Sequence, residues 1–319
     1  MILDKQDAYV IEYPQAVEFA EAQEHIAWTA TEIAMDKDLH DLHNSVTEAE
    51  KHGVVTVLKL FTKYETHVGN EYWLDFVRKV FQRPEIQRMA TEFGRTELSI
   101  HAPFYNRINE VLNLDTEDFY NSYVEDDTLN NRMKWLERQF SKDKLLESLA
   151  IGSITEGAIL YSNFAFLKHF QAEGKNKLVN LSAGINFSVR DENLHSLAGA
   201  WLYRTLLKES NLKAEDKEAL EEAIQVSCDQ VYEHEGRIID MIFEKGDIKG
   251  ITEHQMKQFI KSRLNLCLKQ LGMEERYAVE YDPISKWFYK NVQQAKMNDF
   301  FNNQGSEYSR NWSEQGFVW

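Results

Sequence analysis

The stretch Ser188–His195, SVRDENLH, lies near the middle of a long apolar segment and carries an arginine, an aspartate, a glutamate and a histidine. An ordinary helical core would have leucines at such positions. In a helix, Glu192 and His195 are three residues apart, so both side chains lie on one face about one turn apart. A carboxylate and an imidazole in this arrangement can bind the same metal ion. The stretch therefore predicts a core helix that carries a metal-binding pair.

The composition favours a mostly helical protein. The 319 residues include only 4 prolines and 14 glycines, while leucine, alanine, glutamate and lysine are frequent. No segment shows convincing strand-like alternation. We expect an all-α fold with one helical domain over residues 1–300. Residues 301–319 predict a flexible tail, because they are rich in glycine, asparagine and serine and lack periodicity.

Charge and cysteine content exclude several classes of protein. The formal net charge of -16 argues against a nucleic-acid binder, because phosphate contacts need clustered lysine and arginine. Cys228 and Cys267 are too few for a disulfide scaffold and lack zinc-binding spacing, so we expect reduced thiols. The N-terminus lacks the pattern of a signal peptide, and no uncharged apolar run reaches the ~18 residues of a membrane span. We expect a soluble protein of the cytoplasm.

Several long segments have the apolar periodicity and the cap residues of helices. They are residues 16–35, 45–68, 73–81, 84–114, 144–173, 178–209, 214–245 and 252–271. Residues 115–140 are more polar and predict shorter, exposed helices. Pro103 predicts a kink or a local widening of its helix, because proline removes a backbone donor and clashes with the preceding turn.

A second acid–histidine pair, Glu97 and His101, occurs earlier, and each pair follows a lone acid. Glu65 precedes Glu97 by 32 residues, and Glu156 precedes Glu192 by 36 residues. A helical hairpin of that length returns the chain to the same depth, so two hairpins packed face to face bring four carboxylates and two imidazoles together. Any one of these residues alone would be interpreted as a surface charge. The doubled pattern predicts a dinuclear carboxylate site.

The type of ligand suggests the metal. Oxygen ligands with one imidazole per ion suit iron or manganese, and the absence of thiolates argues against structural zinc. Two irons, two manganese ions or one of each remain open. The first pair departs from the Glu-x-x-His spacing of four-helix di-metal sites, because Glu97 and His101 are four residues apart and Leu98 cannot ligate. Either an α-helix accommodates this spacing directly, or a π-bulge associated with Pro103 absorbs the extra residue.

Four motifs together resemble the small, radical-generating β subunit of class I ribonucleotide reductase, of the type found in bacteria and their phages. They are FTKYETHVGNEYW (61–73), ELSIHAPFY (97–105), SITEGAILYSNFAFL (153–167) and SVRDENLH (188–195). The resemblance covers about residues 16–210 by motif and the whole chain by layout. It implies a ferritin-like helical bundle with a dinuclear metal centre in the core.

The resemblance also implies which residues bind the metals. It assigns one ion to Glu65, Glu97 and His101, and the other ion to Glu156, Glu192 and His195. Glu65 stands where many members of the family have aspartate, and the nearby His67 is a rival ligand. Tyr105, four residues after His101, matches the position of the stable tyrosyl radical; the alternative is an ordinary core tyrosine.

The family relays an electron and a proton between the metal centre and a separate large (α) subunit. Trp28 and Asp191 match the relay positions beside the first metal histidine, and an aspartate next to a ligand can orient that histidine through its second nitrogen. In the tail, Tyr308 is expected as the mobile redox tyrosine, with Trp312 as the other candidate. The apolar end, Phe317–Trp319, would dock in a groove of the large subunit.

The expected function is that of the small subunit of ribonucleoside-diphosphate reductase, a homodimer that is active only with the large subunit. Its metal centre would react with oxygen or superoxide to make a tyrosyl radical, which the large subunit uses to convert ribonucleotides to deoxyribonucleotides for DNA replication. The location would be the host cytoplasm if the chain is phage-encoded. Two alternatives are a related ferritin-like di-metal oxidase and an iron-binding protein, both without a partner subunit. Neither needs the tail, Trp28 or Tyr105.

Overall fold

The computed structural model describes residues 1–289, apart from the side chain of Glu173, and this part of the chain contains helices and no strand. The all-α prediction is therefore confirmed. The longer helices are α1 (Pro14–His25), α2 (Glu48–His67), α4 (Pro84–Thr96), α5 (Ala102–Val111), α7 (Asp127–Leu136), α8 (Leu145–Ala158), α9 (Tyr161–Lys168), α10 (Val179–Ser210), α11 (Ala214–Ile242) and α12 (Glu253–Leu271). Shorter α-helices are α3 (Arg78–Val80) and α6 (Glu117–Asn121).

Several helical segments have other geometries. Three are π-helical, with a wider turn than an α-helix: η3 (Asp41–Ser45), η4 (Val68–Val77) and η5 (Glu97–His101). The tighter 3₁₀ turns are η1 (Ala30–Glu32), η2 (Met35–Asp38), η6 (Ser122–Glu125), η7 (Lys142–Lys144) and η8 (His169–Gly174). π-helical segments are rare and often occur at functional sites. The presence of η4 and η5 therefore indicates a functional site near residues 68–77 and 97–101.

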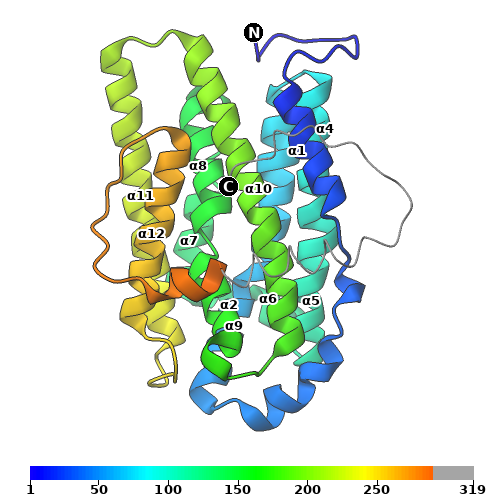
Figure 1. Ribbon diagram of the computed structural model, residues 1–319, viewed down its shortest axis with the longest axis vertical. Helices are drawn as coiled ribbons and strands as arrows, with labels where there is room; N and C mark the ends of the chain where they lie inside the picture. Colours follow the sequence, from blue (N-terminus) through cyan, green and yellow to red (C-terminus); the bar gives the residue numbers. More distant parts are fainter. Residues whose placement is uncertain (290–319) are drawn as a thin grey trace.

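The long helices form one elongated bundle (Figure 1). Helices α8 and α10 pack against each other at its centre, with α11 and α12 on one side and α1 and α4 on the other. Helix α2 packs against α5 and also contacts α11. This arrangement places the middle of α10, with the SVRDENLH stretch, inside the bundle.

Side chains fix where the important helices begin. At the start of α2, Thr47 Oγ1 accepts a hydrogen bond from the backbone N–H of Glu50 at 3.2 Å, and Glu50 Oε2 accepts one from the N–H of Thr47 at 2.9 Å. This capping box satisfies two donors that a helix start leaves free. At the start of α10, Asp38 accepts hydrogen bonds from the backbone N–H groups of Asn180 and Leu181 at 3.2 and 2.6 Å. These caps fix where α2 and α10 begin, and so fix the position of each later residue along the two helices.

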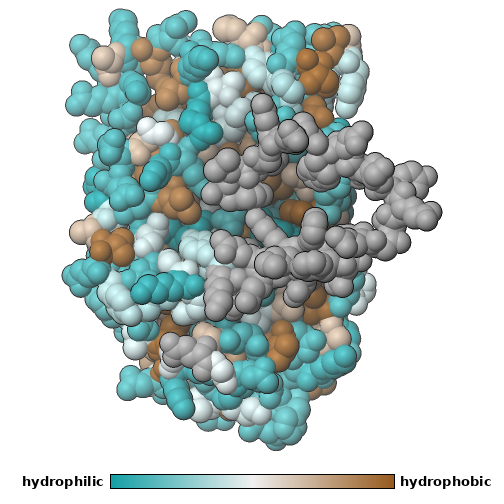
Figure 2. Space-filling model, in the orientation of Figure 1, coloured by the Kyte–Doolittle hydropathy of each residue, from teal (hydrophilic) through white to brown (hydrophobic). Residues whose placement is uncertain are grey.

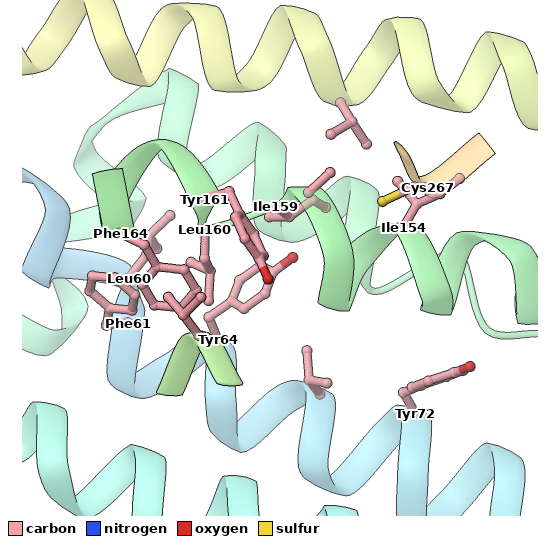
Figure 3. Packing of buried hydrophobic residues seen from close by; sticks show 14 of the residues in the cluster. Leu60, Phe61, Tyr64, Tyr72, Ile154, Ile159, Leu160, Tyr161, Phe164 and Cys267 are labelled. Atoms are coloured by element: carbon pink, nitrogen blue, oxygen red, sulfur yellow. The ribbon is translucent and has the colours of Figure 1, made fainter. Parts of the chain in front are cut away.

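Aromatic side chains fill the core beside the middle of α2. Phe61 stacks on Tyr105 with 4.1 Å between ring centroids, and lies 5.7 Å from the ring of Phe164. Figure 3 shows Phe61 and Phe164 grouped with Leu160 and Tyr64. All five side chains are buried. Close packing of this kind excludes water from the neighbouring interior.

The prediction of one helix over residues 16–35 is wrong, because α1 ends at His25. Trp28 lies in the extended segment that follows. Thr29 then caps the short turn η1: its backbone N–H donates to Glu32 Oε1 at 2.9 Å, in a capping box. The Thr-x-x-Glu signature of a new helix start was present in the sequence, and helix propensity alone concealed it.

The prediction of one helix over residues 144–173 is also wrong. Helix α8 ends at Ala158, and Leu160 has a φ of 70°, which a branched side chain rarely adopts. Helix α9 begins directly afterwards at Tyr161. Leu160 is 3% exposed, so its burial offsets the backbone cost. The residue with positive φ is a leucine and not a glycine, and the nearby Gly157 still has helical geometry within α8.

The visible face of the molecule is mostly hydrophilic, with apolar residues scattered over it (Figure 2). Within residues 1–289, no helix is both long enough and apolar enough to cross a membrane.

Candidate metal centre

Six buried side chains converge between α2, η5, α8 and α10. They are the six predicted ligands: Glu65 on α2, Glu97 and His101 on η5, Glu156 on α8, and Glu192 and His195 on α10. None of the six is more than 4% exposed. Four helical segments that are distant in sequence thus contribute to one interior site.

The six side chains form two overlapping groups, each with four ligand atoms within 4.8 Å of one another. The first group contains Glu65, Glu97, His101 and Glu192, and the second contains Glu97, Glu156, Glu192 and His195. Two carboxylates are therefore common to both groups. Each group also has one acid and one histidine of its own.

In the first group, the Nδ1 atom of His101 faces the carboxylates. It lies 2.8 Å from Glu97 Oε2, 3.1 Å from Glu192 Oε1 and 3.9 Å from Glu65 Oε2. The second group has the same arrangement around His195.

The Nδ1 atom of His195 lies 2.6 Å from Glu97 Oε1, and 3.9 Å from both Glu156 Oε1 and Glu192 Oε2. Glu97 thus presents one oxygen to each histidine. Such an orientation suits a carboxylate that bridges two ions.

The π-helical geometry of η5 accommodates the four-residue spacing of the first pair. The backbone N–H of Ala102 donates to the carbonyl of Glu97, five residues earlier. Because this turn holds more residues than an α turn, Glu97 and His101 both face the site. Of the two alternatives raised by the sequence, the structure has the π-helix. Gly69 of η4 permits close packing here, since a Cβ at that position would lie 2.9 Å from Glu97 Cβ.

The outer nitrogens of the two histidines have different partners. His101 Nε2 lies 3.1 Å from Asp191 Oδ2, and the indole N–H of Trp28 donates to the same oxygen at 2.7 Å. His195 Nε2 lies 3.1 Å from Gln23 Oε1. Such partners fix the ring orientation and the tautomer of a metal-binding histidine. One histidine is therefore backed by a carboxylate and the other by a neutral amide.

Burial makes this cluster unfavourable as a set of free carboxylates. Burial raises the pKa values of Glu65 and Glu156 well above their usual range, and the neighbouring negative charges add to this effect. Burial, followed by the charge of Glu97, raises the pKa of Glu192 to about 7. Burial also opposes ionisation of Glu97, but the two adjacent imidazoles outweigh it and lower the pKa of Glu97.

The residues fit a pair of divalent cations. Four ionised carboxylates carry four negative charges, which two divalent ions would balance, and an uncompensated buried charge is costly. Glu65 Oε1 is buried and accepts no hydrogen bond within residues 1–289. Oxygen donors with one imidazole in each group match the preference of iron and manganese. The donor set is therefore suited to a dinuclear centre.

The other predicted residues are placed as follows. Tyr105 lies on α5 with its hydroxyl buried and, among the described residues, without a hydrogen-bond partner. Burial, and next the charge of Glu65, raise the pKa of Tyr105 well above its usual value, so the phenol keeps its proton. The rival ligand His67 lies outside both groups, with its ring stacked on Phe140 at 6.3 Å. Tyr308 and Trp312 lie outside the described residues.

Two residues beside the cluster, Gln23 and Trp73, were not predicted from the sequence. Trp73 is fully buried, and its indole N–H donates to Glu156 Oε1. A buried tryptophan usually finds an acceptor for its N–H group. The sequence shows Trp73 among apolar residues and shows Glu156 as an isolated acid. It contains no spacing pattern that would predict a contact between the two.

Comparison with known proteins identifies one family. The model of the family described as "Ribonucleotide reductase, small chain" matches residues 6–283. The chain is 27% identical to the probable ribonucleoside-diphosphate reductase small subunit of Invertebrate iridescent virus 3, over 97% of this chain and 86% of the viral protein. It is 24% identical to the ribonucleoside-diphosphate reductase subunit beta of Halalkalibacterium halodurans, over 91% of this chain and 84% of that protein.

Solved structures give the same result for the fold. A putative class I ribonucleotide reductase from Bacillus halodurans superposes with a TM-score of 0.78 at 22% identity, covering 87% of this chain and 99% of that one. The dimanganese(II)-NrdF of Streptococcus sanguinis superposes with a TM-score of 0.77 at 20% identity, covering 92% and 99%. At these identities the likeness shows a common fold.

Proposed function

The chain belongs to the ribonucleotide reductase small-chain family, and we propose on this premise that its six clustered side chains would hold two iron or manganese ions, and that Tyr105 would carry a tyrosyl radical once such a centre has reacted with oxygen or superoxide. The chain is accordingly the ferritin-like small subunit of a class I ribonucleoside-diphosphate reductase, an oxidoreductase that acts with a large subunit. The choice of ligands, the radical site and the relay are the proposal.

One observation carries the proposal: Glu97 and Glu192 belong to both ligand groups. Two shared carboxylates hold two ions close together, whereas two separate ligand sets would form independent sites. Glu65 with His101, and Glu156 with His195, complete the two positions.

When bound, a dinuclear iron or manganese centre supplies the oxidising power for a tyrosine after reaction with oxygen or superoxide. The protein holds the ligands in a dry interior and keeps the tyrosine beside them. Tyr105 is fully buried against Phe61, so a radical on its ring is shielded from water and from other reductants. The proximity of Glu65 and His101, whose charges act on the Tyr105 phenol, supports this choice of residue.

The proposed relay leads from the metal centre through His101, Asp191 and Trp28, and Tyr308 or Trp312 would continue it toward the large subunit. The hydrogen bonds of Asp191 to both of its neighbours support the first part. We place the docking of the large subunit at the C-terminal residues 301–319, and we expect a homodimer in the cytoplasm.

Electron paramagnetic resonance tests the proposal. The metal-free protein would be loaded anaerobically with Fe(II) or Mn(II), and then exposed to oxygen or superoxide. A tyrosyl signal that is absent from Tyr105→Phe is the expected result. A metal-loaded protein without such a signal would contradict the assignment of the radical to Tyr105.

A truncation tests the role of the tail. Removal of residues 307–319 should abolish nucleotide reduction with the large subunit, while metal binding and the tyrosyl signal persist. Full nucleotide reduction by the truncated chain would contradict this role.

A further inference from the structure

Trp73 contacts both residues that belong to the second ligand group alone. It lies on the π-helical segment η4 and is fully buried. Its indole N–H donates to Glu156 Oε1, and its ring meets the ring of His195 edge to face, with 5.9 Å between centroids. Phe93 packs against both rings, with 4.8 Å between its centroid and that of Trp73 and 4.3 Å to that of His195. Trp73 therefore contacts both Glu156 and His195.

The first ligand group is held differently. Its own acid, Glu65, has one oxygen without a hydrogen bond within residues 1–289. Trp28 donates to Asp191, which in turn contacts His101 of this group. In the first group an indole acts on a ligand through a carboxylate, whereas in the second group it acts on a ligand directly.

A direct hydrogen bond to a ligand has two effects. It restricts the rotation of the Glu156 carboxylate, so its oxygens are presented in one orientation. It also reduces the conformational entropy that the Glu156 side chain loses when an ion binds, and this favours binding. The contact with the His195 ring restricts the second ligand in the same way.

We propose that Trp73 is a positioning residue for the second metal ion, because it orients Glu156 and His195 and thereby makes the affinities of the two metal positions separately adjustable. The inference rests on the proposed dinuclear centre. It requires that loss of the Trp73 N–H weakens the ion bound by Glu156 and His195, and leaves the ion bound by Glu65 and His101 unchanged.

The test is a titration of the metal-free, full-length protein with Mn(II), in which electron paramagnetic resonance measures free Mn(II). Wild-type protein should bind two ions. Trp73→Phe should bind one ion with wild-type affinity and the other about 10- to 100-fold more weakly, as for other residues that orient metal ligands.

Trp135→Phe is the matched control. Trp135 is also buried, and its indole N–H donates to Gln230 Oε1 at 2.7 Å, away from the six ligands. This variant loses the same atoms and a comparable hydrogen bond. It should bind both Mn(II) ions as the wild-type protein does.

The titration distinguishes a failure of the proposed dinuclear centre from a failure of the proposed role of Trp73. If wild-type protein binds fewer than two ions, the dinuclear centre itself is wrong. If wild-type protein binds two ions and Trp73→Phe binds both with unchanged affinity, the centre stands and the role of Trp73 is wrong. Equal weakening of both ions by Trp73→Phe also contradicts the separate role.

A measurement on the wild-type protein decides the matter if Trp73→Phe does not fold. The indole N–H signals of ¹⁵N-labelled tryptophan would be followed by nuclear magnetic resonance during titration with Zn(II), which is diamagnetic. Trp28→Phe identifies the other carboxylate-bound indole by removing its signal. The Trp73 signal should shift as Zn(II) is added up to two equivalents, and an unchanged signal at two equivalents would refute the inference.

Discussion

The indole nitrogen of Trp28 lies 2.7 Å from Asp191 Oδ2, and that same oxygen lies 3.1 Å from His101 Nε2. One carboxylate oxygen thus connects a tryptophan near the N-terminus to a proposed metal ligand. The rings of Trp28 and His101 are also close, with 6.0 Å between centroids. The three side chains form a continuous polar path beside the proposed metal centre.

Trp28→Phe should interrupt this path without disturbing the metals, because the contact between Asp191 and His101 does not involve the indole. We expect nucleotide reduction with the large subunit to fall about 10- to 100-fold. Metal stoichiometry and the tyrosyl signal should stay at wild-type levels. Trp201→Phe, which alters a tryptophan that packs on Tyr13 and Phe19, is the control and should keep full reduction. Undiminished reduction by Trp28→Phe would exclude it from the relay.

Glu65→Ala and Glu97→Ala should differ in the number of ions they lose. Glu65 belongs to one ligand group only, so its variant should retain one tightly bound Mn(II). Glu97 belongs to both groups and presents an oxygen to each histidine, so its variant should bind neither ion tightly. Equilibrium dialysis with Mn(II) measures both numbers. The same loss in the two variants would contradict a shared role for Glu97.

Tyr105→Phe should remove the tyrosyl signal but not the metals. Its hydroxyl makes no hydrogen bond in the described part of the chain, so its removal should change the free energy of unfolding by less than about 1 kcal/mol. Tyr72→Phe is a close control, because Tyr72 is fully buried beside Trp73 and its hydroxyl also lacks a partner there. Tyr72→Phe should keep the signal. A signal that survives in Tyr105→Phe and disappears in Tyr72→Phe would transfer the radical to Tyr72.

The clustering of the six side chains could be predicted because its signals are local and repeated. Glu192 and His195 are one helical turn apart, and Glu156 is an isolated acid in an apolar helix. A buried charge without compensation is so costly that a repeated pattern of this kind has few explanations. The helices α2, α10, α11 and α12 were also predicted to within a few residues, since long amphipathic segments carry strong periodicity.

Features that depend on tertiary contacts could not be predicted. The break at Leu160 places a leucine and not the nearby Gly157 at positive φ, and burial of that leucine side chain offsets the cost. The pairing of Trp73 with Glu156 joins two helices across the core, and nothing in either helix specifies the other. The choice of a π-helix for Glu97 and His101 likewise depends on η4 and η5 packing closely at Gly69. The local sequence is compatible with either an α-helix or a π-helix at Glu97–His101.

Glu50 should make the stability of the protein depend on pH. Burial opposes its ionisation, but hydrogen bonds from the Thr47 backbone and from Lys175 and Lys177 outweigh this, so the pKa of Glu50 is lowered. A lowered pKa in the folded state gives stability that is present above the unfolded pKa of about 4.5 and is lost as pH falls through the folded value. Glu50→Gln should therefore lower the free energy of unfolding by about 1 kcal/mol at pH 7.

The difference between wild-type protein and Glu50→Gln should shrink as pH falls below about 4.5. Urea denaturation at several pH values measures it. Glu48→Gln changes an exposed acid in the same turn and should have little effect at any pH. A difference that grows toward low pH would show that the sign of the shift is wrong.

Gly69→Ala should damage the metal site through packing alone. The added Cβ would lie 2.9 Å from Glu97 Cβ and 3.0 Å from Leu98 Cγ, so η5 must move. We expect a loss of about 1–3 kcal/mol in the free energy of unfolding and weaker binding of both Mn(II) ions, because Glu97 serves both groups. Gly236→Ala on α11, where the nearest atom is Lys257 Cε at 3.9 Å, should instead stabilise the protein by about 0.5–1 kcal/mol with unchanged metal binding. Wild-type Mn(II) affinity in Gly69→Ala would show that Glu97 tolerates displacement of η5.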